Sequence, residues 1–405
     1  MKNSFVRRSH GGQKSRNGGY RGKSRKGFSG KRKFSGEKIA QSRYVAKAEE
    51  GFVATSIYAE GKYYRDFSIS QVLKRNIKMK GYVNPTKIQD QAIPYILEGR
   101  DILGLANTGS GKTGAFLIPL LDKVLRDHLQ KCLIIVPTRE LAAQIQEEFN
   151  DLSKHTNIFS SLVIGGSSMS VQIRGLRRKP NFVIGTPGRL KDLYARKIID
   201  LKTFNNIVLD EVDRMLDMGF VADIKYLITN LHAKRQSLFF SATMTHEAEK
   251  IANSLLDNAV KVQVEKESPL KNIEQSMVKV SSQADKMRVL LELLEKTEFK
   301  KVLIFSRTKR GADRLSKRLH EKRFRADSIH GDKSQNRRLR VLSNFKNNKI
   351  DILIATDVAA RGLDIPNVSH VINFDEPENY KDYIHRIGRT GRVGRAGAAL
   401  TFVVV

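Results

Sequence analysis

The stretch DILGLANTGSGKT, residues 101–113, decides the fold class of this chain. An apolar run at 101–106 leads into a glycine-rich loop, and a helical pattern begins at Lys112. This is the strand, loop and helix order of a P-loop, in which backbone N–H groups surround phosphate oxygens and the helix N-terminus adds its positive dipole end. The sequence therefore predicts an α/β sheet that binds a nucleotide.

Eight consecutive residues of this loop are the predicted nucleotide contacts: Ala106, Asn107, Thr108, Gly109, Ser110, Gly111, Lys112 and Thr113. Lys112 is expected to reach the β- and γ-phosphates, and Thr113 is expected to bind Mg²⁺ through its hydroxyl. Ala106 stands where the pattern usually has glycine, which the motif tolerates. The alternative is a chance glycine-rich turn, and the strand and helix on either side make it the weaker interpretation.

An acidic tetrapeptide, Asp210-Glu211-Val212-Asp213, follows the apolar run 207–209. A carboxylate at a strand end can hold Mg²⁺, and its neighbour can orient or deprotonate an attacking water. We assign Asp210 to the metal and Glu211 to the water. By itself the pair is weak evidence, since charged residues commonly follow strands at a solvated edge; together with the P-loop it becomes strong.

Short apolar runs alternate with helical patterns from about Tyr64 onward, which predicts parallel sheets covered by helices. The expected strands are 101–106, 132–137, 181–186, 207–210 and 237–241, then 302–306, 351–356, 368–374 and 399–405. A polar segment that contains Pro269 is the predicted linker. The predicted organisation is a disordered basic tail at 1–50, a first domain at 51–264, a linker at 265–272 and a second domain at 273–405.

The charge balance favours a polyanionic partner, because 73 Lys and Arg face 42 Asp and Glu, a formal charge of +31. Residues 1–36 contain twelve of these cations and no acid, so we expect an unfolded RNA-binding arm, with a solubilising tail as the alternative. The apolar runs are too short to span a membrane, and no apolar segment of a signal peptide follows the basic start. With Cys132 as the single cysteine, these features predict a cytoplasmic protein without a membrane partner.

With the P-loop and the acidic tetrapeptide in place, residues 64–405 resemble a DEAD-box RNA helicase, most closely the bacterial RhlE-like group. The resemblance implies two tandem RecA-like domains. The segment GYVNPTKIQ, residues 81–89, is similar to the family's Q motif, in which the Gln89 amide reads the adenine edge and so favours ATP. The family also places an aromatic residue upstream to stack on the base; Tyr64 matches it, with Phe67 as the fallback.

The resemblance further implies RNA contacts directed at the backbone, with little sequence preference. Hydroxyls, helix N-termini, glycine amides and arginines can all bind phosphates or sugars. In the first domain these residues are Pro137, Thr138, Arg139, Gly165, Gly166, Thr186, Pro187, Gly188 and Arg189. In the second they are Arg307, Gln335, Arg338, Thr356, Asp357, Arg361 and Gly362. RNA is therefore the expected partner, within ribosomal or RNA-turnover assemblies.

Motifs of the second domain complete the predicted ATP site. Asp364 matches the family residue that meets the ribose, and Arg389 and Arg392 match arginine fingers for the γ-phosphate. Such arginines are worth about 10³ to 10⁵ in rate. An isolated arginine cluster would instead be interpreted as a solvated helix end. His385 is expected to link to the acidic tetrapeptide.

Ser241-Ala242-Thr243 resembles the motif that couples hydrolysis to strand separation, and we expect Asp213 to contact Ser241 and Thr243. Together the motifs predict RNA-stimulated ATP hydrolysis that unwinds short duplexes or remodels RNA–protein complexes. An ATP-gated clamp or annealing factor, and a DNA translocase of the same superfamily, are the alternatives.

Overall fold

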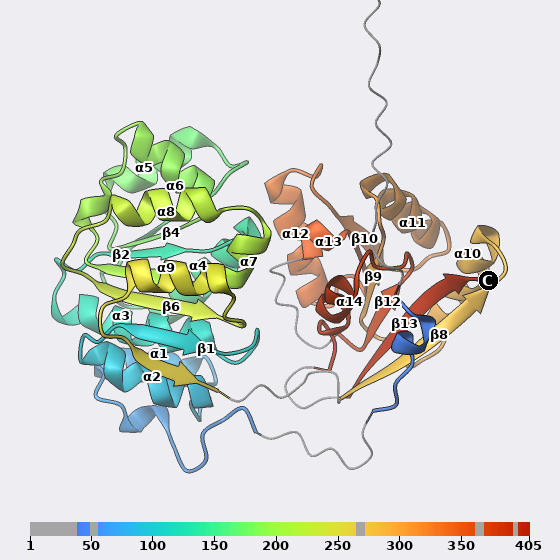
Figure 1. The fold of residues 1–405 in the computed structure, drawn as a ribbon, viewed down its shortest axis with the longest axis horizontal. Helices are drawn as coiled ribbons and strands as arrows, with labels where there is room; N and C mark the ends of the chain where they lie inside the picture. The colour runs from blue at the N-terminus through green and yellow to red at the C-terminus, as the bar shows by residue number, and fades with distance from the viewer. Residues whose placement is uncertain (1–38, 49–55, 265–271, 361–367, 392–395) are drawn as a thin grey trace, which may run out of the picture. The chain divides into compact units, whose positions relative to one another are not determined.

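The computed structural model describes residues 39–48, 56–264, 272–360, 368–391 and 396–405. Within these ranges the chain forms two α/β domains, each built on a parallel sheet with helices on its faces (Figure 1). The predicted fold class is confirmed. The predicted arm at 1–36 lies outside the described residues.

The sheet of the first domain has the strand order β3-β4-β2-β5-β6-β1-β7. The strands are β1 Ile102–Leu105, β2 Cys132–Ile135, β3 Ser160–Val163, β4 Phe182–Gly185, β5 Asn206–Leu209, β6 Gln236–Ser241 and β7 Val260–Gln263. Strands β2, β4, β5 and β6 are buried along their whole length, as expected of parallel strands that are covered on both faces.

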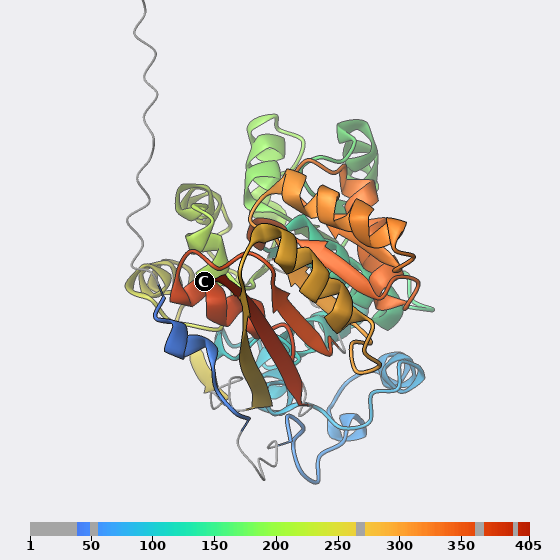
Figure 2. The ribbon, with the colours of Figure 1, turned by 90° about the vertical axis from the view of Figure 1, so that its right-hand side faces the viewer.

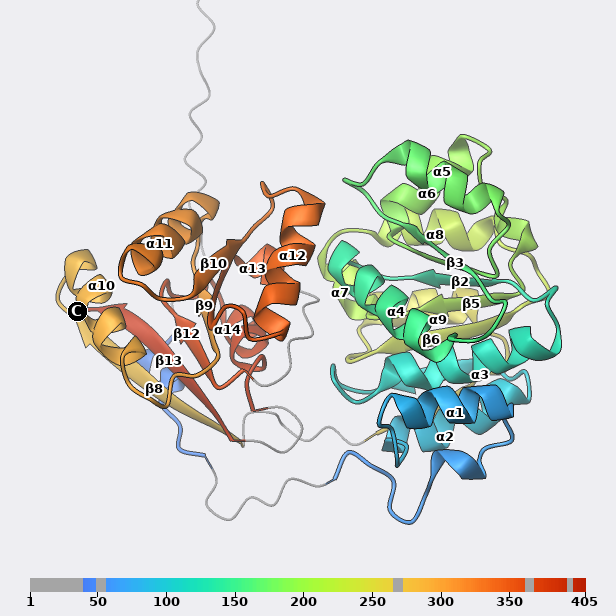
Figure 3. The same cartoon turned by 180° about the vertical axis from the view of Figure 1, so that it is seen from behind.

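Helices cover both faces of this sheet. On one face pack α1 Gln71–Met79, α2 Lys87–Leu97, α3 Lys112–Arg126 and α4 Arg139–Leu152 (Figure 3). On the other face pack α5 Met169–Arg177, α6 Pro187–Ala195, α7 Val212–Asp217, α8 Val221–Thr229 and α9 His246–Leu255. Two short 3₁₀ helices, η2 Tyr64–Asp66 and η3 Leu201–Thr203, complete the domain. Along β2, alternate residues enter the two cores: Ile134 faces one and Leu133 the other.

Polar caps place several helix starts at the carboxyl edge of the sheet. Thr138 begins α4 and Thr245 begins α9, and each side-chain oxygen accepts a hydrogen bond from the helix backbone. Helix α6 starts with Pro187 directly after Thr186, where proline's fixed φ fits the first turn. The edge at which the predicted motifs lie is therefore lined with helix N-termini.

The sheet of the second domain has the order β10-β11-β9-β12-β13-β8. Its strands are β8 Ile273–Val280, β9 Val302–Phe305, β10 Ala326–Ile329, β11 Ile352–Ala355, β12 His370–Asn373 and β13 Gly397–Val404. Helices α10 Gln283–Leu294 and α11 Lys309–Glu321 share one core. Helices α12 Gln335–Lys346 and α13 Asp357–Ala360 share a second, and α14 Tyr380–Ile387 packs in a third with β8 and β13.

All nine predicted strands are present, and β3, β7, β8 and β10 are additional. Within the described ranges, every helix falls short of the length and apolar character that a membrane span requires. The domain boundaries expected from the sequence stay a prediction. Residues 41–44, which lie inside the predicted tail, form the 3₁₀ helix η1 Gln41–Tyr44.

Asp101 gives a stability prediction for the first domain. Its buried carboxylate accepts hydrogen bonds from the backbone N–H groups of Ser237, at 2.7 Å, and Asp257, at 2.8 Å. Asp101→Ala should lower the unfolding free energy of this domain by about 2–4 kcal/mol, because two buried donors lose their acceptor. Urea unfolding would measure the loss. Glu98→Ala removes the same charge from an exposed position and should cost far less; equal losses for both variants would contradict the account.

Candidate functional site

The loop between β1 and α3 requires glycine at two positions. Gly109 has φ +85° and Gly111 has φ +94°, in the left-handed region that other residues rarely adopt. A Cβ on Gly111 would also lie 2.6 Å from Thr86 Oγ1 and 2.8 Å from Gln89 Nε2. The glycines therefore shape the loop and let it lie against the first turn of α2.

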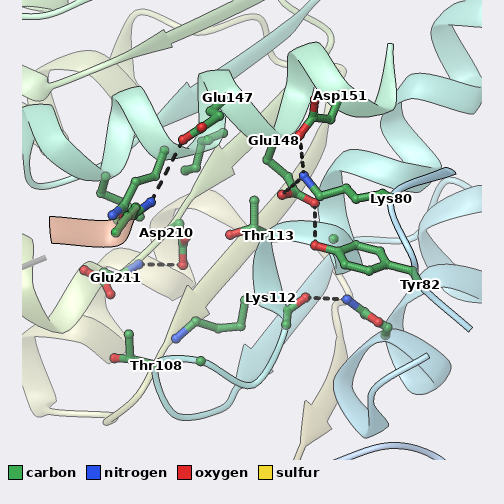
Figure 4. A pocket seen from close by; sticks show the side chains of 18 residues that line it. Lys80, Tyr82, Thr108, Lys112, Thr113, Glu147, Glu148, Asp151, Asp210 and Glu211 are labelled. Carbon is green, nitrogen blue, oxygen red and sulfur yellow. Dashed lines mark hydrogen bonds and ion pairs between the residues drawn. The ribbon is translucent and has the colours of Figure 1, made fainter. Parts of the chain in front are cut away.

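The side chains of this loop suit an anionic ligand. Lys112 is buried and its Nζ donates to the Ala106 carbonyl oxygen at 2.8 Å, inside the curve of the loop. The Ser110 hydroxyl is buried and has no hydrogen-bond partner among the described residues. Thr108 and Thr113 line the same pocket as Lys112 (Figure 4). Lys112, Thr108 and Thr113 thus bring a cation and two hydroxyls to the lining of one pocket, as an anionic ligand requires.

The acidic pair opens onto this pocket from the end of β5. Asp210 and Glu211 are both buried and both line the pocket (Figure 4). Glu211 has φ +54°, an uncommon value for a residue with a side chain. Its backbone N–H donates to Asp210 Oδ1 at 2.9 Å, which holds the sharp turn between strand and α7.

Electrostatics distinguish the two carboxyl groups. Burial raises the pKa of Asp210, and the nearby Lys112 only partly opposes this effect. Burial acts in the same direction on Glu211, but Arg214 and Lys112 outweigh it and hold the pKa of Glu211 below its usual value. Arg214 Nη1 lies 2.5 Å from Glu211 Oε2. Arg214 and Lys112 thus favour the ionised form of Glu211, whereas burial favours the protonated form of Asp210.

Gln89 joins the loop to the start of α2. Its Nε2 donates to the Gly111 carbonyl oxygen at 2.9 Å, and its Oε1 accepts from the Thr86 backbone N–H at 2.9 Å. The Tyr64 hydroxyl also donates to Gln89 Oε1. Gln89 is therefore fixed by three contacts at the rim of the pocket.

The aromatic residue that lines the pocket is Tyr82, which the sequence analysis did not select. Tyr64 is only 5% exposed and lies stacked against Tyr82, with ring centres 6.1 Å apart. The Tyr82 hydroxyl donates to Glu148 at 3.0 Å, and Lys80 lies 2.6 Å from the other oxygen of Glu148 (Figure 4). Base stacking by Tyr64 stays a prediction, and Tyr82 is the ring with direct access to the pocket.

Three predicted RNA-binding segments of the first domain come together at the carboxyl ends of β2, β3 and β4. The Arg139 guanidinium lies directly over Gly165 and Gly166, where a Cβ would overlap it. Arg189 Nη1 donates to the Ser167 carbonyl oxygen at 3.4 Å. The N-termini of α4 and α6, at Thr138 and Thr186, lie at this same edge of the sheet. Both arginines thus share one loop.

The predicted contact of Asp213 with the Ser241–Thr243 segment is present. Asp213 Oδ2 accepts from the Thr243 backbone N–H at 3.0 Å and from its hydroxyl at 3.1 Å. The Asp213 N–H donates to Ser241 Oγ at 3.2 Å, and that hydroxyl donates to the Thr243 carbonyl oxygen. These hydrogen bonds therefore connect the acidic tetrapeptide directly to the segment at the end of β6.

In the second domain a buried arginine organises the predicted residues. Arg386 donates to both oxygens of Asp357, at 2.6 and 2.7 Å, and to the Asp375 carbonyl oxygen at 2.7 Å. Asp357, predicted as an RNA contact, is thus a partner of α14. Arg386 itself is not among the residues predicted from the sequence.

The remaining predicted residues lie at strand ends and helix starts. Arg307 follows β9 and is exposed, and Thr356 follows β11. Gln335 and Arg338 occupy the first turns of α12. Arg389 follows α14, with its Nε donating to the His385 carbonyl oxygen at 3.3 Å. Arg361, Gly362, Asp364 and Arg392 lie outside the described residues.

Two family models match the chain. The DEAD/DEAH box helicase model matches residues 86–251, and the helicase conserved C-terminal domain model matches residues 285–394. Among solved structures, Saccharomyces cerevisiae Dbp5 bound to RNA and ADP BeF3 is 32% identical, with a TM-score of 0.73 over 85% of this chain and 90% of that one. Mss116p bound to single-stranded RNA and AMP-PNP is 30% identical, with a TM-score of 0.72 over 83% and 73%.

Curated relatives agree with these matches. The DEAD-box ATP-dependent RNA helicase CshA of Streptococcus pneumoniae is 43% identical over 342 residues, which are 84% of this chain and 65% of the relative. CshA of Bacillus cereus is 42% identical over the same shares. The chain thus spans about two thirds of the length of these relatives. Matched along both α/β domains by family models, curated relatives and solved structures alike, the chain belongs to the DEAD-box helicase family.

Proposed function

We propose that this chain is an RNA-stimulated ATPase that couples ATP hydrolysis to local unwinding of short RNA duplexes or to remodelling of RNA–protein complexes. The observation that carries the proposal is the convergence of the P-loop, Gln89 and the Asp210–Glu211 pair on one pocket. The arginine and glycine cluster at the ends of β2, β3 and β4 supports RNA as the second ligand. The related Dbp5 structure holds RNA together with ADP BeF3.

The pocket residues fit ATP and Mg²⁺. The Lys112 ammonium and the glycine turns suit phosphates. Proteins usually bind Mg²⁺ through one or two side chains together with substrate phosphates and water. Thr113 and Asp210 would hold it, and the bound ion would neutralise charge on the phosphates.

Glu211 is the proposed base for the attacking water. Its lowered pKa keeps it ionised, so that it can accept a hydrogen bond from the water and orient it for attack or for deprotonation. Arg389 and Arg392 are the proposed arginine fingers, and Asp364 the proposed ribose contact. Because these residues belong to the second domain, closure of the two domains around both ligands would complete the site. ATP and RNA then favour the same closed state and strengthen each other's binding.

RNA recognition should be largely independent of sequence. The proposed contacts are Arg139, Arg189, glycine amides and helix N-termini, and these groups bind phosphates and sugars rather than base edges. A contact to the 2′-OH would distinguish RNA from DNA. The Asp213, Ser241 and Thr243 network is the proposed link between hydrolysis and strand separation.

ATP turnover with and without added RNA tests the proposal. We expect the rate to rise on addition of single-stranded RNA and to rise much less with DNA of the same sequence. Equal rates with and without RNA would overturn the helicase interpretation. Stimulation by DNA equal to that by RNA would favour a translocase instead.

Deletion of residues 1–36 separates unwinding from annealing. An ATP-gated clamp in which the basic tail holds RNA predicts that annealing disappears while ATP turnover persists. The proposed helicase predicts that RNA-stimulated turnover and duplex unwinding both survive the deletion at saturating RNA. Strand-displacement and annealing assays on one duplex would report both activities.

Finer assignments stay predictions. The RhlE-like subgroup is proposed from the sequence motifs, whereas the relatives described above carry the name CshA. Mg²⁺ use, a cytoplasmic location and participation in ribosomal or RNA-turnover assemblies are likewise proposed from the family resemblance.

Two substitutions of Tyr64 separate its possible roles. If Tyr64 acts by holding Gln89, Tyr64→Phe should raise the KM for ATP about three- to ten-fold, the cost of one lost hydrogen bond. If Tyr64 acts by stacking on the base, Tyr64→Phe should leave the KM unchanged and only Tyr64→Ala should raise it. Tyr95→Phe removes an exposed hydroxyl from α2, the helix that carries Gln89, at a position that does not line the pocket, and is the matched control.

A further inference from the structure

Residues 39–46, the N-terminal strap, contact the second domain although they precede the first domain in the sequence. Ala46 forms an isolated antiparallel bridge with Gln275 of β8, through backbone hydrogen bonds of 3.0 and 2.8 Å. The helix η1 precedes this bridge. Figure 2 shows the strap, in blue, beside β8 and β13. A segment that precedes the first domain in the sequence thus contacts the second domain.

Tyr44 provides the buried hydrophobic contact of the strap, and the half-buried Ile39 packs against the same cluster. Tyr44 is 2% exposed and belongs to a cluster with Ile273, Tyr383 and Ile387. Its ring meets that of Tyr383 edge-on, with centres 5.1 Å apart. Arg43 adds a cation–π contact, because its guanidinium carbon lies 4.9 Å from the centre of the Tyr380 ring. Tyr380 and Tyr383 both belong to α14.

The strap is not expected to fold in isolation. A 3₁₀ helix of four residues cannot stabilise itself in water, and Tyr44 is its only buried residue. Burial of a tyrosine removes roughly 150–250 Å² from water. The conformation of the strap therefore depends on its docking against α14 and β8.

Helix α14 is held on two sides. On one side Arg386 is locked by Asp357 and the Asp375 carbonyl oxygen. On the other, the Tyr383 hydroxyl donates to Gln275 Oε1 at 2.8 Å, and Gln275 is the residue whose backbone is bridged by Ala46. His385 lies on the same helix, and Arg389 follows directly after it. Loss of the contacts on the Tyr383 side would leave α14 held by the hydrogen bonds of Arg386 and by the packing of Ile387.

We propose that the N-terminal strap is a positioning element for the arginine-finger helix: through Tyr44, it fixes the orientation of α14 and so the placement of His385 and Arg389. This inference rests on the proposed role of Arg389 in ATP hydrolysis. Small displacements of a catalytic group are costly, since a shift of about 1 Å can lower a rate on the order of 100-fold. The strap should therefore affect the chemical step more than ATP binding.

The test is steady-state ATP turnover by the full chain carrying Tyr44→Ala, at saturating RNA. We expect kcat to fall about 10- to 100-fold with the KM for ATP changed less than about three-fold, because the ATP-binding residues of the first domain are untouched. Tyr44→Phe keeps the ring and should restore kcat. An unchanged kcat in Tyr44→Ala, or a KM effect as large as the kcat effect, would overturn the proposal.

A matched control separates positioning from loss of stability. Leu294→Ala truncates a buried side chain of the same domain, on α10 in a different core, and should lower thermal stability without lowering kcat well below the melting temperature. If Leu294→Ala reduced kcat as much as Tyr44→Ala, the strap would have only a structural role. Amide hydrogen exchange provides a readout that is independent of ATPase activity. Tyr44→Ala should speed exchange across α14. Unchanged exchange there would contradict the proposed positioning of α14 by the strap, even if the wild-type chain proved not to be RNA-stimulated.

Discussion

Glu211→Gln should bind ATP and RNA with near-normal affinity and yet turn ATP over about 10²- to 10⁴-fold more slowly. Glutamine keeps the size of the side chain but cannot accept a proton from water. The wild-type side chain is ionised, because Arg214 and Lys112 hold its pKa low despite burial, and it can therefore accept a hydrogen bond from the water. Single-turnover hydrolysis, measured together with the Kd for a fluorescent ATP analogue, would separate chemistry from binding.

The control for this variant is Glu247→Gln, the same chemical change in the exposed first turn of α9. It should leave turnover unchanged. Normal turnover by Glu211→Gln would refute the assignment of the base. A loss of ATP binding that accounted for the whole effect would instead assign Glu211 to ligand binding or to the fold, through its ion pair with Arg214.

Arg389→Ala should lower kcat by about 10³-fold or more while the KM for ATP changes little, because an arginine finger acts on charge that develops in the transition state. Arg389→Lys should recover only a small part of the rate, since lysine lacks the planar fork of donors. Steady-state kinetics at saturating RNA would measure both effects.

Arg314→Ala removes one exposed arginine from α11 of the same domain and is the matched control, with an expected kcat close to that of the wild type. If Arg389→Ala raised the KM and left kcat unchanged, Arg389 would contribute to ground-state binding of the nucleotide. The arginine-finger assignment would then be wrong.

The features that the sequence predicts well are those in which local chemistry and position coincide. The P-loop combines an apolar strand, glycines at positive φ and a helix start, and each of these parts can be recognised in the sequence. The expected contacts of Asp213 with Ser241 and Thr243 are present for the same reason, because both segments follow buried neighbouring strands.

The four strands that were not predicted lack a continuous apolar run. Strand β7 alternates valine with Lys261 and Gln263, and β10 contains Asp327 and Ser328. Both lie at the edges of their sheets, where exposed polar residues are tolerated. Strand β8 is also at an edge and begins directly after the predicted linker.

Three features depend on tertiary contacts and cannot be predicted from a local sequence pattern. They are the place of Tyr82 in the pocket, the partners of Arg386 and the docking of the N-terminal strap. Tyr82 is the aromatic residue of the pocket only because η2 and α1 bury Tyr64 behind it. The residues next to Arg386 in the sequence resemble those of a solvated helix end, whereas its side-chain partners come from β12 and α13. The strap is a short segment with a single aromatic residue, Tyr44, and the aromatic partner of that residue is more than three hundred residues away.

The central claim is that ATP and RNA favour one closed arrangement of the two domains. The most direct measurement is the Kd of a single-stranded RNA with and without a non-hydrolysable ATP analogue, at fixed salt. The account predicts that the analogue tightens RNA binding by about 5- to 150-fold and that RNA tightens analogue binding by the same factor. RNA affinity that is the same with and without the analogue would contradict it.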